Sequence, residues 1–318
     1  MKIVTTTEIG MESALAKLEK AYKGQENKLP DLWASSCSTG YPDLDKLTGG
    51  LNSGLIVVAG RTLHGAEVLH RNLFENAMLE LGCAAENDKK ALFFNTSMSS
   101  DDFYMQVLSS LSRVKLDTLM KGSLSDEDWS RVSSTMGLLM ENQPLLTANQ
   151  STLYIEDVES ICNEAIEQYG QLPVVAFDSL QAIRSRKSCD NRYAEIAEIT
   201  RTLKAMSVKL DTRLIVKSSL NRNLEQRADK RPVLFDLRDS GTIEDDATLV
   251  IFSYLNSVYN PDECFDGASL MEAITAKSPN GSVGTTTLLH NAPFSRVDDY
   301  CEPKDAEVVE FPSPEEQD

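Results

Sequence analysis

The sequence lacks the features that mark a secreted, metal-binding or membrane protein. Its six cysteines are scattered, with no C-x-x-C pair or other metal-ligand spacing, which argues against a zinc module or a disulfide scaffold. No apolar run reaches the roughly 18–20 residues that a membrane span requires. The first twenty residues carry acids and no apolar core, unlike a secretory signal. The sequence therefore predicts a soluble, cytoplasmic protein that makes no membrane contact and holds no metal.

Basic residues are also scarce. Lysine and arginine total 31 against 49 acids, a net charge of −18, which argues against a surface that coats long nucleic acids. A few local cations in a narrow channel would still suffice to hold DNA. The segment 302–318 alone has seven acids, one lysine and three prolines, and this composition predicts a disordered acidic tail. The tail is either a solubilising end or a segment that binds a partner or mimics DNA.

The body of the chain has the pattern of an α/β domain. Hydrophobic residues make up 41% of the sequence, enough for a full core. Helical patterns such as 194–210 lie between the apolar runs, and this alternation predicts a mostly parallel, doubly wound sheet covered on both faces. Shorter β-like segments at 269–277 and 284–290 predict an antiparallel extension. The runs predicted as buried strands are 55–60, 91–95, 174–179, 214–219 and 248–254.

An amphipathic helix is predicted before this body. Met11, Leu15, Leu18 and Tyr22 follow a helical spacing and form one apolar stripe. A polar stretch containing a proline separates the stripe from the rest, so the stripe packs either on its own domain or on a neighbouring molecule. We therefore divide the chain into a linker helix with its flexible linker (1–37), a main domain (38–301) and the acidic tail (302–318).

A glycine-bounded loop follows the first predicted strand. Gly60 and Gly65 have the spacing of G-x-x-x-x-G-K-[ST], the loop that holds a triphosphate between a strand and a helix. Ala66 and Glu67, however, fill the lysine and hydroxyl positions. One lost contact between unit charges is worth on the order of 4 kcal/mol at an effective dielectric near 20, so tight nucleotide binding is disfavoured. The loop is either a vestigial phosphate site or an ordinary turn.

Two further functions for residues near this loop stay open. His64 or Arg61 could supply the missing positive charge. Glu67 and His70, three residues apart, could bind a metal, although an ordinary surface pair is the simpler interpretation because no second such pair is visible.

The surrounding strings identify a family resemblance. They resemble the C-terminal motor domain of bacterial DnaB-type replicative helicases, a RecA-like ATPase that assembles as a ring on single-stranded DNA. The resemblance extends from the first helix to about Tyr300, without the family's separate N-terminal primase-binding domain. The strings that carry it are STGYPDLDKLTGGLNSG (38–54), SLSDEDWSRVSSTMG (123–137), DNRYAEIAEITRTLKA (190–205), SLNRNLEQRADKRP (219–232) and DLRDSGTIEDDATLVIF (236–252).

The resemblance implies roles for several residues. Asp178 stands where the family's Walker B aspartate helps to hold magnesium. Arg238, Asp239 and Gly241 lie in the family's channel loop, which touches the DNA backbone. The first helix corresponds to the linker helix that packs on the adjacent subunit of the ring, and this would give its apolar stripe a partner.

The chain also departs from the family pattern, and each departure falls on the ATP site. Position 66 has alanine in place of the family's lysine, and position 67 has glutamate in place of threonine. The water-activating glutamate is replaced by Ser97, and the γ-phosphate-sensing glutamine by Ser219. The arginine finger of the K-Q-R-N-G string is replaced by Pro279, while Lys277 survives.

These departures lead to one main hypothesis and two alternatives. The main hypothesis is a catalytically inactive DnaB-like protein, a pseudoenzyme that acts in DNA replication as a ring subunit, regulator or inhibitor of the replicative helicase. Its expected partners are DnaB-type subunits or further copies of itself, with single-stranded DNA as a further ligand. We expect no cofactor, and ATP or ADP with magnesium only if the degenerate site still binds them. The alternatives are an active 5′-to-3′ helicase with unconventional motifs and a passive ring that binds single-stranded DNA.

Overall fold

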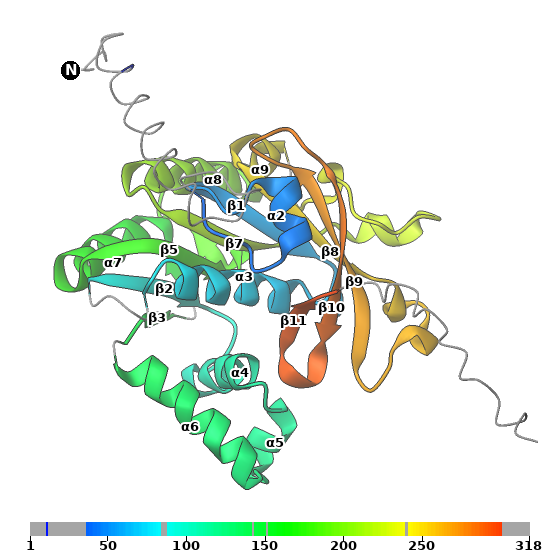
Figure 1. Ribbon diagram of the computed structural model, residues 1–318. Helices are drawn as coiled ribbons and strands as arrows, with labels where there is room; N and C mark the ends of the chain where they lie inside the picture. The colour runs from blue at the N-terminus through cyan, green and yellow to red at the C-terminus, as the bar shows by residue number, and fades with distance from the viewer. Residues whose placement is uncertain are drawn as a thin grey trace, which may run out of the picture.

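One mixed sheet organises the molecule. The computed structural model describes Met11 and residues 36–83, 88–141, 143–150, 152–238 and 241–300. Its main sheet has the strand order β11-β10-β9-β8-β1-β7-β5-β2-β3 (Figure 1). The six strands from β8 to β3 run parallel, and β9, β10 and β11 continue the sheet antiparallel. The predicted parallel sheet with an antiparallel extension is confirmed.

The strands correspond to the apolar runs of the sequence. β1 shows why, since six of its seven residues are buried and their side chains alternate between the two faces of the sheet. The bounds are β1 (Gly54–Gly60), β2 (Lys89–Asn95), β3 (Leu145–Asn149), β5 (Gln171–Asp178), β7 (Arg213–Ser219), β8 (Leu249–Leu255), β9 (Ala268–Lys277), β10 (Gly284–Asn291) and β11 (Arg296–Asp299), with β4 (Leu153–Tyr154) and β6 (Ile183–Arg184) forming a separate pair.

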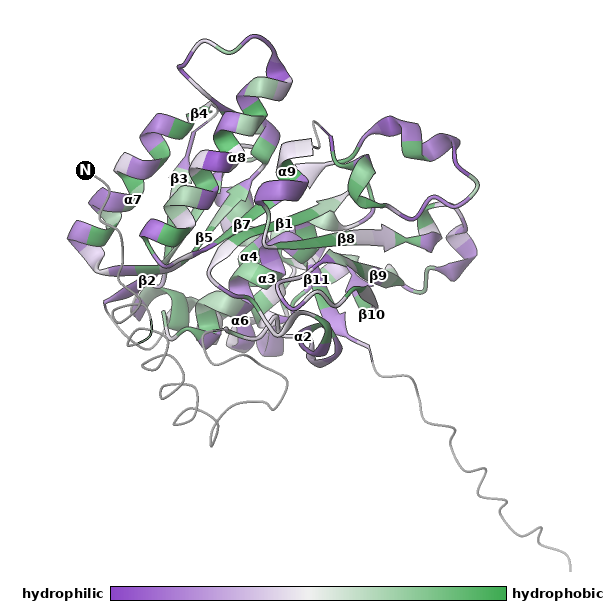
Figure 2. Cartoon of the chain, turned by 90° about the horizontal axis from the view of Figure 1, so that it is seen from above, coloured by the Kyte–Doolittle hydropathy of each residue, from purple (hydrophilic) through white to green (hydrophobic). Residues whose placement is uncertain are grey.

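Helices cover both faces of the sheet, and the sheet separates two hydrophobic cores. Figure 2 shows α7, α8 and α9 on one side and α2, α3, α4 and α6 on the other. α4, α5 and α6 form a small group beside the sheet, with a minor core of their own (Figure 1). The bounds are α2 (Pro42–Thr48), α3 (Ala66–Glu80), α4 (Ser100–Ser112), α5 (Leu116–Lys121), α6 (Asp126–Glu141), α7 (Ile155–Tyr169), α8 (Arg192–Lys209) and α9 (Gly241–Asp246).

Some predictions fall on residues that the structure does not describe. Leu15, Leu18 and Tyr22 of the predicted linker helix lie outside the described residues, as do the acidic tail and Asp239. The predicted ends of the three segments therefore stay predictions. Within the described part of the chain, no helix combines the length and apolar character needed to cross a membrane.

Candidate functional site

The candidate site lies where three neighbouring parallel strands end. In the pairing of β1 with β7, Gly60 lies opposite Ser219, and β5, on the other side of β7, ends at Asp178. The carboxyl ends of parallel strands share one edge of a sheet, which is where ligands bind in open α/β folds. The structure thus brings together the predicted positions from three separate segments of the chain.

The conformation and packing of the loop after β1 require both of its glycines. Gly65 has φ +72°, a left-handed conformation, and a Cβ atom there would lie 2.5 Å from Cε of Met271. A Cβ atom on Gly60 would lie 2.4 Å from Oγ of Ser253. The loop leads directly into α3, whose first residue, Ala66, is buried. Packing alone accounts for both glycines, so the spacing is not by itself a sign of phosphate binding.

Neither cation proposed to replace the missing lysine is free to do so. Nε of Arg61 lies 2.9 Å from the carboxylate of Glu225, which also accepts a hydrogen bond from the hydroxyl of Tyr259 at 2.9 Å. His64 is buried, and its Nδ1 accepts a hydrogen bond from the backbone N–H of Leu255 at 3.0 Å. Burial also lowers the pKa of His64, which favours the neutral ring. Both side chains fasten the loop to its surroundings.

The interpretation of Glu67 and His70 as a surface pair is wrong. Glu67 is exposed, but His70 is buried beneath the sheet, where its Nε2 donates to the carbonyl of Ile215 at 3.1 Å. Burial lowers the pKa of His70 to about 4. Among the described residues, no group of three histidine, cysteine or acidic side chains is arranged to hold a metal ion.

Asp178 is held by two partners that the sequence did not predict. Its carboxylate forms an ion pair with the ammonium of Lys217 and accepts a hydrogen bond from the hydroxyl of Ser97. Burial raises the pKa of a carboxyl group, but the Lys217 charge and the two hydrogen-bond donors outweigh it and hold the pKa of Asp178 below its ordinary value. Lys217 could have been noticed as the one charged residue near the end of the apolar run LIVKSS.

Ser219 links the strand ends to the predicted DNA loop. Its backbone N–H donates to the side-chain oxygen of Gln181 at 3.1 Å, and the amide of Gln181 donates to the hydroxyl of Ser218 at 3.0 Å. The carbonyl of Ser219 accepts from the backbone N–H of Arg238 at 3.1 Å. Local hydrogen bonds therefore fix the backbone of Ser219, the residue predicted to replace the family's γ-phosphate-sensing glutamine.

The described part of the predicted DNA loop is exposed. The side chain of Arg238 is exposed, and Phe235, three residues earlier, is 83% exposed. Gly241 begins α9 against Tyr193, whose hydroxyl would lie 2.4 Å from a Cβ atom at Gly241. Exposed aromatic rings and cations are the side chains that bind single-stranded nucleic acids, and sequence reasoning did not single out Phe235.

The two residues of the finger string lie apart from Asp178. Lys277 ends β9 and donates to the carbonyl oxygen of Glu244 at 2.6 Å, at the end of α9. Pro279 is exposed in the turn that follows, which is held by Asn280 and by Gly281 at φ +76°. The turn therefore presents no cation from position 279.

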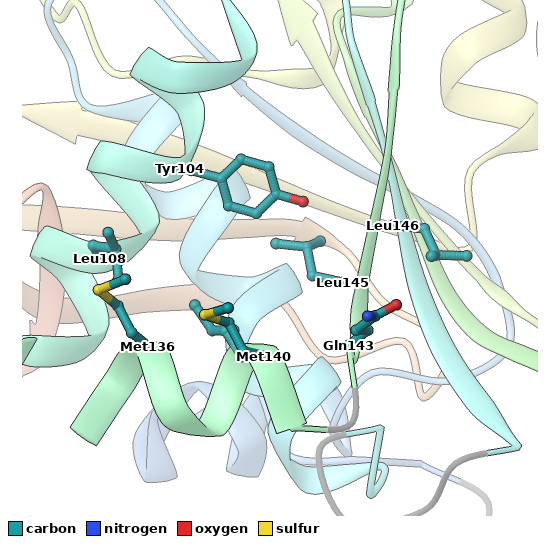
Figure 3. Close-up of a pocket in the computed structure, with 8 residues that line it drawn as sticks. Tyr104, Leu108, Met136, Met140, Gln143, Leu145 and Leu146 are labelled. Atoms are coloured by element: carbon teal, nitrogen blue, oxygen red, sulfur yellow. The ribbon is translucent and has the colours of Figure 1, made fainter. Parts of the chain in front are cut away.

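An apolar hollow lies between α4, α6 and the edge strand β3. Its volume is about 380 Å³, and α6 exposes large apolar side chains beside it, with Met136 at 41% and Met140 at 68% (Figure 3). Sequence reasoning did not identify it. The side chains that line the hollow are Tyr104, Leu108, Met136, Leu139, Met140, Gln143, Leu145 and Leu146.

Comparison with known proteins now places the chain. The family model of the DnaB-like helicase C terminal domain matches residues 36–299. The chain belongs to this family. The replicative DNA helicase DnaB of Buchnera aphidicola subsp. Schizaphis graminum is 39% identical over 295 residues, 92% of this chain and 61% of that protein. The DnaB of Pasteurella multocida is 40% identical over 84% of this chain and 56% of that protein. The chain is thus homologous to replicative helicases but spans only about three fifths of their length.

Solved structures agree on the fold. The ATPase domain of G40P has a TM-score of 0.78 and 23% identity, covering 91% of this chain and 98% of that one. A DnaB-like replicative helicase, solved in a study of its interactions with primase, has a TM-score of 0.73 and 22% identity, covering 94% of this chain and 68% of that one. These likenesses confirm the RecA-like fold of the DnaB C-terminal domain.

Proposed function

We propose that this chain is a catalytically inactive DnaB-like subunit that joins a ring of helicase subunits and regulates it. One observation carries the proposal: the scaffold of the ATP site persists, but the side chains at its edge do not suit a triphosphate. Ala66 opens α3 without a charge, and the cations of Arg61 and Lys217 are held by Glu225 and Asp178.

The losses are large enough to silence catalysis. In ATPases of this kind, an arginine finger contributes about 10³–10⁵ in rate, and Pro279 carries no charge. A positioned general base contributes about 10²–10⁴, and the hydroxyl of Ser97 donates to Asp178 instead of accepting a proton. A site without these groups and without its phosphate lysine hydrolyses ATP negligibly.

The apolar hollow of α4 and α6 supports assembly with other subunits. We assign it to the predicted linker helix of a neighbouring subunit, whose apolar stripe is predicted to consist of Met11, Leu15, Leu18 and Tyr22. Met11 is 58% exposed, and amphipathic helices bind to apolar grooves through residues at this spacing. Figure 3 shows Met136 and Met140 pointing into the hollow, and methionine side chains adapt well to such partners.

An inactive subunit would affect more than its own site. The resemblance to DnaB-type rings implies that each ATP site is shared by two neighbours. One inserted copy would silence its own ATP site and also the neighbouring ATP site, which would receive Pro279 in place of an arginine finger. A few copies would therefore slow or stop a ring of active subunits.

A mixing experiment tests this function. The purified protein is titrated into an active DnaB helicase while complex formation, ATPase activity and unwinding are measured together. We expect a stable complex, no ATPase from the protein alone, and a fall in helicase activity steeper than simple dilution. ATP hydrolysis by the purified protein that disappears in Asp178→Ala would contradict the proposal and favour an active helicase.

A passive role on single-stranded DNA is the second candidate. It is favoured by the exposure of both Phe235 and Arg238 in one segment of the chain. This role predicts DNA binding that is independent of nucleotide, with no complex and no change in DnaB activity in the same mixing experiment.

A further inference from the structure

Lys217 is a charged residue between buried residues of β7, the strand that begins with Arg213. It is the fifth residue of β7, in register with Val58 of β1, and its neighbours Ile215 and Val216 are fully buried. Its ammonium contacts Oδ1 of Asp178, while Oδ2 accepts from Ser97. The exposed fractions of the two charged side chains are 22% for Lys217 and 7% for Asp178. Both oxygens of the carboxylate therefore face groups of the same chain, Oδ2 through a hydrogen bond and Oδ1 through the charge of the ammonium without a well-formed hydrogen bond.

The surroundings of the Asp178 carboxylate do not suit a bound Mg²⁺ ion. Mg²⁺ takes oxygen ligands in a near-octahedral arrangement, and a carboxylate bound to an ammonium has its charge already neutralised. The hydroxyl that usually completes the magnesium site is replaced at position 67 by an exposed glutamate. Among the described residues, Asp178 belongs to no group of three or more acidic, histidine or cysteine side chains that could hold a metal ion.

We propose that Lys217 is an internal counter-ion that takes the place of a divalent cation at Asp178 and closes that position to metals. The inference rests on the proposed function, because an inactive subunit still needs a partner for a buried carboxylate. A buried charge without a partner is strongly destabilising. With Lys217 in place, the strand ends keep their arrangement and the subunit assembles without magnesium or nucleotide.

The test compares variants of the full chain with and without metal. Lys217→Met keeps most of the length of the side chain and removes its charge, and Asp178→Asn removes the opposite charge. Lys121→Met is the matched control, because Lys121 forms a lysine–aspartate pair with Asp117 in which both side chains are at least 66% exposed. Thermal unfolding is followed in EDTA and in millimolar MnCl₂, and bound Mn²⁺ is counted by electron paramagnetic resonance.

The inference predicts a distinct pattern across the variants. In EDTA, Lys217→Met should lower Tm by about 5 °C or more, whereas Lys121→Met should leave it unchanged. Mn²⁺ should raise the Tm of Lys217→Met and bind to it, while the wild-type protein shows neither effect. The double variant Lys217→Met/Asp178→Asn should recover most of the lost Tm, and Mn²⁺ should neither bind to it nor change its Tm.

Three results would overturn the inference. The first is a Lys217→Met variant as stable as the wild-type protein in EDTA. The second is a destabilised variant that fails to bind Mn²⁺, which would reduce Lys217 to an ordinary ion-pair partner. The third is Mn²⁺ binding by the wild-type protein that Asp178→Asn abolishes. ATP hydrolysis by the wild-type protein would instead contradict the proposed function, so the two failures are distinguishable.

Discussion

The backbone N–H of Arg238 donates a hydrogen bond to the carbonyl of Ser219, at 3.1 Å. Leu220, which follows Ser219, and Leu237, which precedes Arg238, pair in an isolated antiparallel β-bridge. The loop predicted to touch DNA is thus fastened to the strand end that borders the candidate ATP site.

The first prediction concerns this loop. Arg238→Ala should weaken binding to single-stranded DNA and reduce the dependence of log K on log salt by about 0.7, the value for one phosphate contact. Fluorescence anisotropy with a labelled oligonucleotide at several salt concentrations measures both. Arg131→Ala is the control, since Arg131 lies on α6 and pairs with Glu127. Equal salt slopes for Arg238→Ala and the wild-type protein would remove Arg238 from the DNA interface.

The second prediction concerns the hollow of α4 and α6. Met140→Asp places a charge in the apolar lining and should weaken association with DnaB or with other copies by tenfold or more, about 1.4 kcal/mol. The fold should persist, because Met140 is 68% exposed. Leu138→Asp is the matched control, since Leu138 is an exposed apolar residue of the same helix that does not line the hollow. Analytical ultracentrifugation measures the association, and equal loss in both variants would argue against a specific groove.

The third prediction concerns pH. All three histidines in the sequence, His64, His70 and His290, have a pKa lowered by burial. A lowered pKa means that the unfolded chain binds protons first, so stability falls as the pH drops below about 6.5. With the pKa of His70 at about 4, this residue alone should cost about 2 kcal/mol between pH 7 and pH 5.

Urea unfolding at the two pH values checks this expectation. His70→Gln keeps a donor for the Ile215 carbonyl but does not titrate, so its stability should vary less with pH than that of the wild-type protein. The same loss in both proteins would assign the pH dependence to other groups.

The sequence predicted the sheet well because its strands are buried on both faces. Runs such as 55–60 and 248–254 have nothing but apolar and small residues, and they became β1 and β8 with shifts of one residue. The edge strand β3 was missed because it is short and only half covered, with one buried residue among five. Helix α6 buries only Val132, so its pattern gave no clear apolar face.

The sequence predicted which residues lie at the candidate site but not which side chains contact them. Gly60 was named from motif spacing, and Asp178 and Ser219 from the family resemblance; strand pairing brings all three to one edge. Lys217 was not named, because its contact with Asp178 crosses 39 positions of sequence and depends on β5 lying beside β7. Contacts of this kind follow from topology, which local patterns do not contain.

The last prediction concerns a buried ion pair that fastens α3 to its neighbours. Nε of Arg71 lies 3.0 Å from the carboxylate of Glu75, and both side chains are almost fully buried. Arg71 also donates to the carbonyl of Ser295 in the β10–β11 connection, and Glu75 accepts from Ser110 of α4 at 2.6 Å. Burial raises the pKa of Glu75 while the Arg71 charge opposes that rise. The pair therefore holds α3, α4 and the antiparallel extension together.

Removing one partner should cost far more than removing both. Arg71→Met leaves the Glu75 carboxylate buried without its cation and should lower the free energy of unfolding by about 3–5 kcal/mol. Arg71→Met/Glu75→Leu should recover part of that loss, because no charge then remains in the core. Arg131→Met, which breaks an exposed pair with the same spacing, should cost about 0.5 kcal/mol or less. Guanidinium unfolding ranks the variants, and equal costs for Arg71→Met and Arg131→Met would show that burial does not set the strength of the Arg71 pair.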